Sequence, residues 1–290
     1  MNSPFKRIGL FIRKDDPVME NAVIQVTEFL LARSLTVFIN EPLNFLPQLE
    51  VISISDFPRQ CDLTIAIGGD GTLLSVSRAL SDSNLPIVGI NIGRLGFLAD
   101  ITLAKLEQQL SEVLAGNYRE DTRFMMHANI INDTDHPVGK AMNDIVVHAN
   151  QSLHMIEFET YINGKFLNSQ RADGLVVATP TGSTAYAMSA GGPILDVNLD
   201  ALVLASVCPH TLSNRPLVVA ASSIIDIVLS ENNTTSAMVT CDGRPGHVLQ
   251  PGDTVRIERY PSNITLLHLE NHDHYSILRA KLEWGRKLTC

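Results

Sequence analysis

A glycine-rich stretch that directly follows an apolar run places the strongest constraint on the fold of this chain. The apolar residues Leu63–Ile67 are typical of a buried strand, and Gly68-Gly69-Asp70-Gly71-Thr72 follow them at once. Residues 73–80 then favour a helix. Glycine lets the backbone adopt positive φ and approach a ligand closely, and the free N–H groups of a helix N-terminus favour an anion. The stretch therefore predicts a phosphate-binding loop between a strand and a helix, formed by Gly68, Gly69, Gly71 and Thr72.

Asp70 is the unusual member of this loop, because a bare carboxylate repels phosphate. It could accept a proton from an attacking hydroxyl group, or it could hold Mg²⁺ against the phosphates. It could equally be the N-cap of the following helix, since aspartate caps helices well. The loop by itself leaves these roles open.

The composition restricts the class of protein. A net charge of −9 argues against general nucleic-acid binding, which needs a basic face. With 290 residues, of which 45% are hydrophobic, the chain has enough apolar residues for about two domains. The apolar runs are too short to span a bilayer, and residues 1–14 lack the apolar region of a secretory signal. The scattered cysteines, without a C-x-x-C pair, indicate reduced thiols in a cytoplasmic protein: Cys61, Cys208, Cys241 and Cys290.

The first part of the chain alternates between strand and helix patterns. Predicted strands at residues 8–12, 35–39, 63–67 and 86–90 are separated by helical spacing or irregular segments, and a last helix is predicted near residues 102–114. This alternation predicts an α/β domain over residues 1–121, with a parallel sheet flanked by helices.

The pattern changes near residue 118. From residue 124 to residue 269 almost every segment has strand character, and turn signals such as Asn163-Gly164 and Pro251-Gly252 separate several of the segments. Residues 122–269 are therefore predicted to form an all-β domain, a sandwich of antiparallel sheets. Helical spacing returns at residues 276–284, and we expect residues 270–290 to pack back onto the first domain.

Two polar clusters adjoin apolar stretches of the chain. The sequence N-I-G-R-L-G-F at residues 91–97 follows the strand that ends near residue 90. Because ligands of open α/β sheets bind at the carboxyl ends of strands, it could share the site of Gly68 to Thr72, or it could be a tight turn. Asn143-Asp144 interrupts an apolar stretch. Such a pair can bind ribose hydroxyls or an adenine amine, although taken alone it is better explained as a surface turn.

A third cluster surrounds one strand. Arg171-Ala172-Asp173-Gly174 precede it, and Thr179-Pro180-Thr181-Gly182-Ser183-Thr184-Ala185-Tyr186 follow it. The hydroxyls and turn amides of the second stretch could hold a polar ligand beside the Tyr186 ring, and such loops at strand ends are often functional. Arg171 could pair with phosphate, or with Asp173 in a surface salt bridge.

Three other features have simpler interpretations. Asp242-Gly243-Arg244-Pro245-Gly246 is interpreted as a β-turn that closes a strand. His272-Asp273-His274 lacks a third ligand at suitable spacing and is interpreted as a solvated turn rather than a metal site. His154 lies between apolar residues and is interpreted as a hydrogen-bonded core histidine, unless a ligand passes nearby.

Together the clusters closely resemble the motifs of the NAD kinase family. Gly68 to Thr72 is similar to its G-G-D-G motif, residues 91–97 to its N-x-G-x-L-G-F segment, and Asn143-Asp144 to its N-E/D motif. The D-G…T-P-x-G-S-T-A-Y motif, matched from Asp173 to Tyr186, is the most specific. The resemblance implies an N-terminal α/β domain, a C-terminal β-domain and a site between them. It also implies Mg²⁺-dependent transfer of the γ-phosphoryl group of ATP to the 2′-hydroxyl of the adenosine ribose of NAD, giving NADP and ADP.

The resemblance also assigns roles to residues. Asp70 would be the catalytic acid/base residue, and the ligands of the metal stay unassigned. Asp144 stands where many members have Glu, and Arg244 where many have Gln, which leaves the role of Arg244 open. Family members are usually dimers or tetramers, so a homodimer or homotetramer is expected. The residues expected to bind NAD are Asp70, Gly71, Asn143, Asp144, His154, Arg171, Asp173, Thr184, Ala185, Tyr186, Ala187, Met188 and Ser189.

Two other functions stay open at this point. Diacylglycerol and sphingosine kinases and 6-phosphofructokinases carry a similar G-G-D-G loop, although residues 179–186 resemble lipid kinases less well. A non-catalytic NAD(P)-binding regulator is the second alternative, and the presence of Asp70 argues against it because binding alone needs no carboxylate facing phosphate. The sequence does not fix whether polyphosphate replaces ATP, or whether NADH is accepted.

Overall fold

The computed structural model describes residues 4–13, 19–93, 96–131, 136–150 and 155–284. The chain divides into two compact units. The first unit comprises Met1–Thr122 and Ile264–Cys290, and the second comprises Arg123–Asn263. Residues 264–269, which the sequence pattern assigned to the all-β domain, thus belong to the first unit, because the long strand β18 (Thr254–Leu269) runs from one unit into the other.

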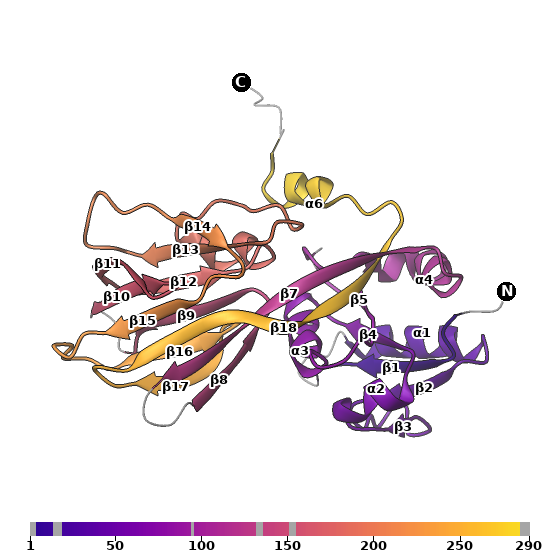
Figure 1. Ribbon diagram of the computed structural model, residues 1–290. Helices are drawn as coiled ribbons and strands as arrows, with labels where there is room; N and C mark the ends of the chain where they lie inside the picture. The colour runs from indigo at the N-terminus through magenta and orange to yellow at the C-terminus, as the bar shows by residue number, and fades with distance from the viewer. Residues whose placement is uncertain (1–3, 14–18, 94–95, 132–135, 151–154, 285–290) are drawn as a thin grey trace. The chain divides into compact units, whose positions relative to one another are not determined.

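The first unit is built on a sheet whose strands are ordered β18-β5-β4-β1-β2-β3, with β6 beside β5 (Figure 1). The pairings of β1 with β4 and of β4 with β5 are parallel, and Leu266 near the end of β18 pairs in parallel with Ile87. These pairings confirm the predicted parallel sheet. The remaining strands are β1 (Arg7–Phe11), β2 (Thr36–Ile39), β3 (Glu50–Val51), β4 (Leu63–Ile67), β5 (Ile87–Asn91) and β6 (Ile101–Thr102).

Helices cover this sheet because their apolar residues recur at helical spacing. In α1, the fully buried Ala22, Val26 and Leu30 lie on one face and join the same core as Ile8 and Ile65 of the strands. Among the described residues, no helix is both long and apolar enough to cross a membrane. The helical segments are α1 (Met19–Leu31), η1 (Ile54–Asp56), α2 (Phe57–Gln60), α3 (Asp70–Ala79), η2 (Leu103–Lys105), α4 (Leu106–Leu114) and α6 (His274–Lys281).

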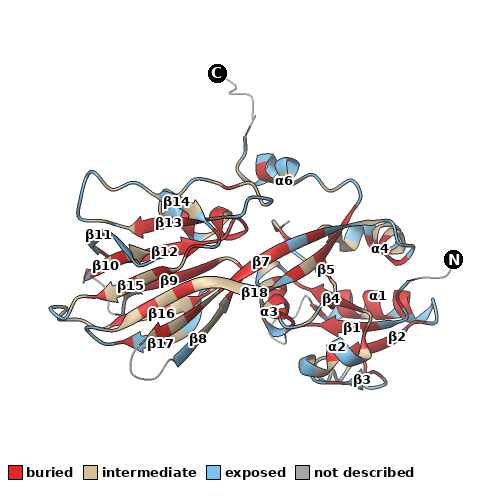
Figure 2. Cartoon of the chain, viewed as in Figure 1, coloured by how far each residue is buried: buried red, intermediate tan, exposed pale blue. Residues whose placement is uncertain are grey.

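The second unit holds two antiparallel groups of strands. One is a sheet with the order β14-β13-β12-β9-β16-β17, and the other contains β11, β10, β15 and the first part of β18, with β7 and β8. Alternate residues of both groups meet in one buried core, coloured red in Figure 2, as period-2 patterning requires. The strands are β7 (Tyr118–Ile131), β8 (His136–Ala141), β9 (Asp144–Ala149), β10 (Ile156–Ile162), β11 (Lys165–Ala172), β12 (Gly174–Ala178), β13 (Ala201–Val207), β14 (Leu217–Ala220), β15 (Ile225–Leu229), β16 (Ala237–Cys241) and β17 (Arg244–Leu249).

This unit confirms the predicted β-sandwich. Of the turn predicted over residues 242–246, only Asp242 and Gly243 form it, because residues 244–246 already belong to strand β17. Asp242 and Gly243, with φ of 49° and 64°, connect β16 to β17, and Cys241 pairs with Arg244. Positive φ at both central residues is the geometry of a tight two-residue hairpin. The polar stretch after β12 contains two short helical turns, η3 (Gly182–Thr184) and α5 (Tyr186–Ser189).

Candidate functional site

The predicted phosphate loop connects β4 to α3 in the first unit. Gly68 has a φ of +153°, and a Cβ at this position would lie 2.3 Å from Oγ1 of Thr72, so only glycine fits without a shift. Gly69 and Gly71 are exposed, whereas Gly68 and Thr72 are buried. The loop thus presents Gly69 and Gly71 to solvent at the N-terminus of α3, where an anion site is favoured.

Asp70 is the first residue of α3, and Gly69 occupies the N-cap position. The capping interpretation of Asp70 is therefore wrong. Its Oδ2 instead accepts the backbone N–H of Phe97 at 2.7 Å, and its Oδ1 accepts that of Leu98 at 3.2 Å. A Cβ on Gly96 would lie 1.9 Å from Oδ1 of Asp70, so the backbone of residues 96–98 lies directly against this carboxylate.

The segment after β5 therefore lies beside the phosphate loop. The sequence allowed either this shared site or a tight turn, and the contacts with Asp70 favour the shared site. The buried Asn91 closes the start of the segment, because its Oδ1 accepts the N–H of Gly93 at 3.1 Å. Arg94 and Leu95 of this predicted motif lie outside the described residues.

The sequence interpretation missed Arg13. This exposed residue follows β1, and its Nη1 lies 3.7 Å from the position of a Cβ on Gly71. Because β1 and β4 are parallel neighbours, their carboxyl ends meet at one edge of the sheet. The basic pair Arg13-Lys14 just after the first strand was the available signal.

In the second unit, Asp242 holds the backbone around Asn143 and Asp144. Its Oδ1 accepts the N–H of Asn143 at 2.8 Å and that of Asp144 at 3.3 Å, and its Oδ2 accepts that of Met142 at 3.2 Å. The N–H of Asp242 donates to the carbonyl of Asp144 at 2.9 Å. The backbone of the pair is therefore held in place at the start of β9, with Asp144 buried and Asn143 intermediate in exposure, so the surface-turn interpretation is wrong.

The side chains of this pair are poised for a ligand. Asp144 is 5% exposed, and burial raises its pKa to about 6, with the nearby Asp242 charge adding to the effect and a backbone N–H of Tyr186 opposing it. Oδ1 of Asn143 is buried and has no hydrogen-bond partner within the described part of the chain. Buried polar atoms are normally satisfied, so a donor group on a ligand fits this position.

The hydroxyl-rich stretch after β12 packs against the same backbone. Thr179 donates through Oγ1 to the carbonyl of Met142 at 2.6 Å and accepts the N–H of Gly182 at 3.1 Å. A Cβ on Gly182 would lie 2.0 Å from the carbonyl oxygen of Asn143, so this glycine permits the approach. Of the residues predicted to bind NAD here, Ala187 is buried, Thr184, Ala185 and Met188 are intermediate in exposure, and Tyr186 and Ser189 are exposed.

Arg171 and Asp173 lie at the other end of β12. Ala178 pairs with Asp144, whereas Gly174 pairs with His148, so Asp173 and Thr179 are separated by the whole strand, roughly 20 Å at about 3.3 Å per residue. Within a single copy of the chain, Arg171 and Asp173 therefore lie far from Asn143 and Asp144. His154 lies outside the described residues.

Arg171 does not form the alternative salt bridge with Asp173. Its Nε lies 3.9 Å from Oε1 of Glu157, and both side chains are about half exposed. It also lines a cavity of about 540 Å³ together with Arg215 and His210. Arg171 is therefore accessible to an anionic ligand.

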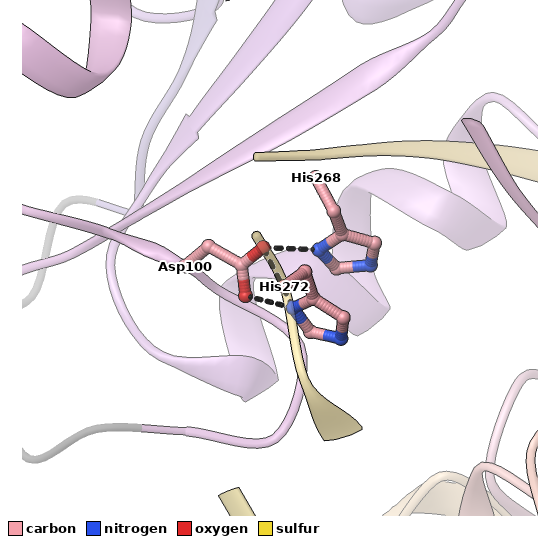
Figure 3. Close-up of side chains that lie close together, drawn as sticks. All are labelled: Asp100, His268 and His272. Carbon is pink, nitrogen blue, oxygen red and sulfur yellow. Dashed lines mark hydrogen bonds and ion pairs between the residues drawn. The ribbon is translucent and has the colours of Figure 1, made fainter. Parts of the chain in front are cut away.

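A buried group of titratable residues lies elsewhere in the first unit. The solvated-turn interpretation of His272 is wrong, because its side chain is 2% exposed and its Nδ1 lies 2.7 Å from Oδ1 of Asp100. Nδ1 of His268 lies 2.7 Å from Oδ2 of the same carboxylate (Figure 3). No local sequence pattern could have joined these residues, since Asp100 and His268 are 168 positions apart.

Two family models match the chain. The ATP-NAD kinase N-terminal domain matches residues 8–118, and the ATP-NAD kinase C-terminal domain matches residues 142–269. A protein of Nitrosococcus oceani named NAD kinase is 54% identical over 99% of this chain and 100% of its own length. An NAD kinase of Hahella chejuensis is 45% identical over 97% of this chain and 96% of its own length.

Two solved structures share the fold. The yeast NADH kinase complexed with NADH superposes with a TM-score of 0.86 at 24% identity, covering 99% of this chain and 90% of the yeast chain. An NAD kinase from Archaeoglobus fulgidus in complex with ATP superposes with a TM-score of 0.76 at 24% identity, covering 96% of this chain and 98% of that chain.

Proposed function

The chain belongs to the ATP-NAD kinase family, and from this premise we propose that it transfers the γ-phosphoryl group of ATP to the 2′-hydroxyl of the adenosine ribose of NAD. The observation that carries the proposal is the Asp70 carboxylate, which lies in a glycine loop suited to phosphates and is held by two backbone N–H groups. NADP and ADP are the products.

The proposed reaction makes one bond and breaks one at phosphorus, and it moves one proton from the hydroxyl to Asp70. The 2′-oxygen attacks the γ-phosphorus, the bond from that phosphorus to the β–γ bridging oxygen breaks, and the hydroxyl proton passes to Asp70. Such in-line transfers depend mainly on positioning and charge stabilisation. The N–H groups of Phe97 and Leu98 fix the direction of the Asp70 carboxylate, and each of its oxygens keeps a lone pair for the substrate.

Mg²⁺ belongs to the proposal, and the residues present fit it. Mg²⁺ prefers oxygen ligands and is usually held by one or two carboxylates, water and substrate phosphates. Asp70 is the carboxylate beside the exposed glycines, so it is the residue that would hold the ion, which supplies charge neutralisation at the phosphates.

We assign the nucleoside contacts to the second unit. Asp144 would accept hydrogen bonds from ribose hydroxyls, and the unpartnered Oδ1 of Asn143 would accept one from the adenine amine or the adjacent ribose. Tyr186, which is 46% exposed, offers its ring for stacking. Residues 184–189 would complete this side of the NAD site.

We further propose that the protein is a cytoplasmic homodimer or homotetramer. The separation of Arg171 and Asp173 from the Asn143 pair supports self-association, since one dinucleotide touching both groups would have to contact two copies of the chain. Among the described residues, Cys61, Cys208 and Cys241 form no disulfide, which supports a reducing compartment.

A coupled assay tests the reaction. The purified protein is incubated with Mg²⁺, ATP or polyphosphate, and NAD or NADH, and the product is detected with a dehydrogenase that accepts only NADP. We expect NADP from NAD, and no phosphorylation of an analogue without the 2′-hydroxyl. Absence of NADP with both donors would refute the function, and phosphorylation of diacylglycerol or sphingosine instead would identify a lipid kinase.

Asp70→Asn tests the role of the carboxylate. Loss of a proton acceptor should lower kcat by roughly 10²-fold or more, while NAD still binds. Raising the Mg²⁺ concentration separates the two roles, because it would restore activity only if the loss were weaker metal binding. A folded variant with nearly normal kcat would exclude both roles.

A further inference from the structure

The buried group in the first unit consists of Asp100, Asp121, His268 and His272, which we call the histidine cluster. Asp100 accepts hydrogen bonds from both histidines through their Nδ1 atoms, at 2.7 Å for each. Nε2 of His268 lies 3.2 Å from Oδ2 of Asp121. The side chains of both histidines are 2% exposed, and those of the two aspartates are 10% and 8% exposed. His268 is thus placed between two buried carboxylates, with His272 stacked on its ring at 4.0 Å.

The geometry of the cluster fits protons better than a metal ion. Distances of 2.7 Å between nitrogen and oxygen are those of charge-assisted hydrogen bonds. The two imidazole rings are stacked with an interplanar angle of 24°, so their Nδ1 atoms point side by side (Figure 3). A metal ion about 2.1 Å from each nitrogen needs lone pairs that converge on one point. The cluster is therefore a hydrogen-bonded clamp around the carboxylate of Asp100.

This clamp lies next to the segment that orients Asp70. Phe97 and Leu98 donate their N–H groups to Asp70, and Asp100 follows only two residues later. Ala99, between Leu98 and Asp100, is 1% exposed. It packs closely on β5, since a Cβ built on Gly89 would lie 2.9 Å from the Cβ of Ala99. Residues 96–100 are thus held by the histidine cluster at Asp100, while the N–H groups of Phe97 and Leu98 hold the carboxylate of Asp70.

A second contact links the C-terminal residues to the same segment. Nζ of Lys281, at the end of α6, lies 5.4 Å from the centre of the Phe97 ring, within the range of a cation–π interaction. His268, His272 and Lys281 therefore all contact residue 97 or residue 100, whereas none of these contacts reaches Asp70 itself.

We propose that His268 and Asp100 are positioning residues for Asp70: the C-terminal segment fixes residues 96–100, and these residues fix the direction of the reactive carboxylate. The proposal rests on the phosphoryl transfer inferred above. It gives His268 and His272, which do not contact Asp70 themselves, a specific effect on catalysis. A 1 Å displacement of a catalytic group can be costly, because the reacting atoms must be aligned.

The kinetic test uses His268→Gln and Asp100→Asn, with Arg279→Gln as the matched control. Arg279 lies on α6, where it pairs with Asp273 on the exposed face and does not contact the cluster. We expect kcat of both test variants to fall about tenfold, as for a misaligned catalytic group, and KM for ATP and NAD to change less than about threefold. The control should match the parent protein. Equal kcat per folded molecule in all three variants would overturn the proposal.

The pH profile gives a second readout. Three titratable groups face His268, namely Asp100 before β6, Asp121 of β7 and His272 before α6. When His268 loses its positive charge, the negative charges of Asp100 and Asp121 are no longer both balanced. We therefore expect kcat of the parent protein to fall as pH rises above the pKa of His268. This fall should be absent in His268→Gln. His272→Phe, which keeps a ring on His268 but removes one donor to Asp100, should lower kcat by a smaller factor and serves if His268→Gln does not fold.

Hydrogen exchange distinguishes failure of this proposal from failure of the proposed function. Asp100→Asn should speed exchange in a peptide covering residues 96–98, which carries the N–H groups bound to Asp70. This measurement needs no turnover, so it remains valid if the protein forms no NADP. Unchanged exchange there, or stoichiometric zinc in the purified protein by metal analysis, would overturn the positioning role.

Discussion

The carboxylate of Asp242 accepts the backbone N–H of Asn143 at 2.8 Å, across 99 positions of sequence. Two adjacent backbone N–H groups, those of Met142 and Asp144, point to the same carboxylate. The residue that forms the β16–β17 turn thus also fixes the start of β9, where the proposed nucleoside contacts begin.

Asp242→Asn should weaken this arrangement, because an amide accepts through one oxygen and directs its own N–H groups at the donors. We expect the free energy of unfolding to fall by about 1–3 kcal/mol. The pKa of Asp144 should also fall, because a nearby like charge is removed. Urea unfolding measures the first effect, and the pH dependence of KM for NAD the second. Asp253→Asn is the control, because its carboxylate accepts a single N–H, that of Gln250, in an exposed turn. It should lower the free energy of unfolding by less than Asp242→Asn does.

Asp144→Asn should make the ligand-free protein more stable at neutral pH while weakening NAD binding. The folded pKa of about 6 lies above the ordinary value of 3.8, so the folded state binds this proton more tightly than the unfolded chain. The charged form therefore destabilises the fold increasingly as pH rises from about 4 to about 6, and the penalty persists above that range. We expect a gain of about 1–3 kcal/mol at pH 8 that vanishes below about pH 4.

Unfolding curves across this pH range, together with KM for NAD, check the prediction. KM should rise roughly tenfold, as for the loss of one charge-assisted hydrogen bond, whereas KM for ATP should change little. Asp200→Asn, at a side chain that is 79% exposed, should change neither the unfolding curves nor KM for NAD. A loss of stability at pH 8 in Asp144→Asn would contradict the assignment of a destabilising buried charge.

Gly96→Ala should displace the Asp70 carboxylate, because the new Cβ would lie 1.9 Å from Oδ1. We expect kcat to fall at least about tenfold with a smaller change in KM for NAD. Gly93→Ala is the matched comparison in the same segment, since no described residue other than its chain neighbours lies within 4 Å of a Cβ built there, and kcat should fall much less. Equal effects of the two substitutions would show that Asp70 tolerates movement of residues 96–98.

Arg13→Ala should raise KM for ATP about tenfold, because a guanidinium beside Gly71 is placed to pair with phosphate oxygens. KM for NAD and kcat at saturating ATP should change less. The effect should shrink at high ionic strength, where exposed charge pairs are screened. Arg119→Ala, at another exposed arginine of the first unit, tests for a general effect of charge. An unchanged KM for ATP would remove Arg13 from the site.

Features that depend on neighbouring residues were determined by the sequence alone. The buried strand Leu63–Ile67, the glycine loop after it and the hairpin turn at Asp242-Gly243 follow from side-chain size, periodicity and backbone freedom within a few residues. The change from strand–helix alternation to strands near residue 118 likewise predicted an α/β part and a β-sandwich.

Only the tertiary structure decided which distant groups meet. Asp70 with Phe97, Asp242 with Asn143 and Asp100 with His268 are joined by strand order and chain crossings, which no local pattern encodes. The same reason explains why the local pattern interpreted His272 as part of a solvated turn, although its side chain is buried against Asp100. Local free energies set the conformation of each segment, whereas contacts between segments are decided by packing of the whole core, where burial and partner charges are established together.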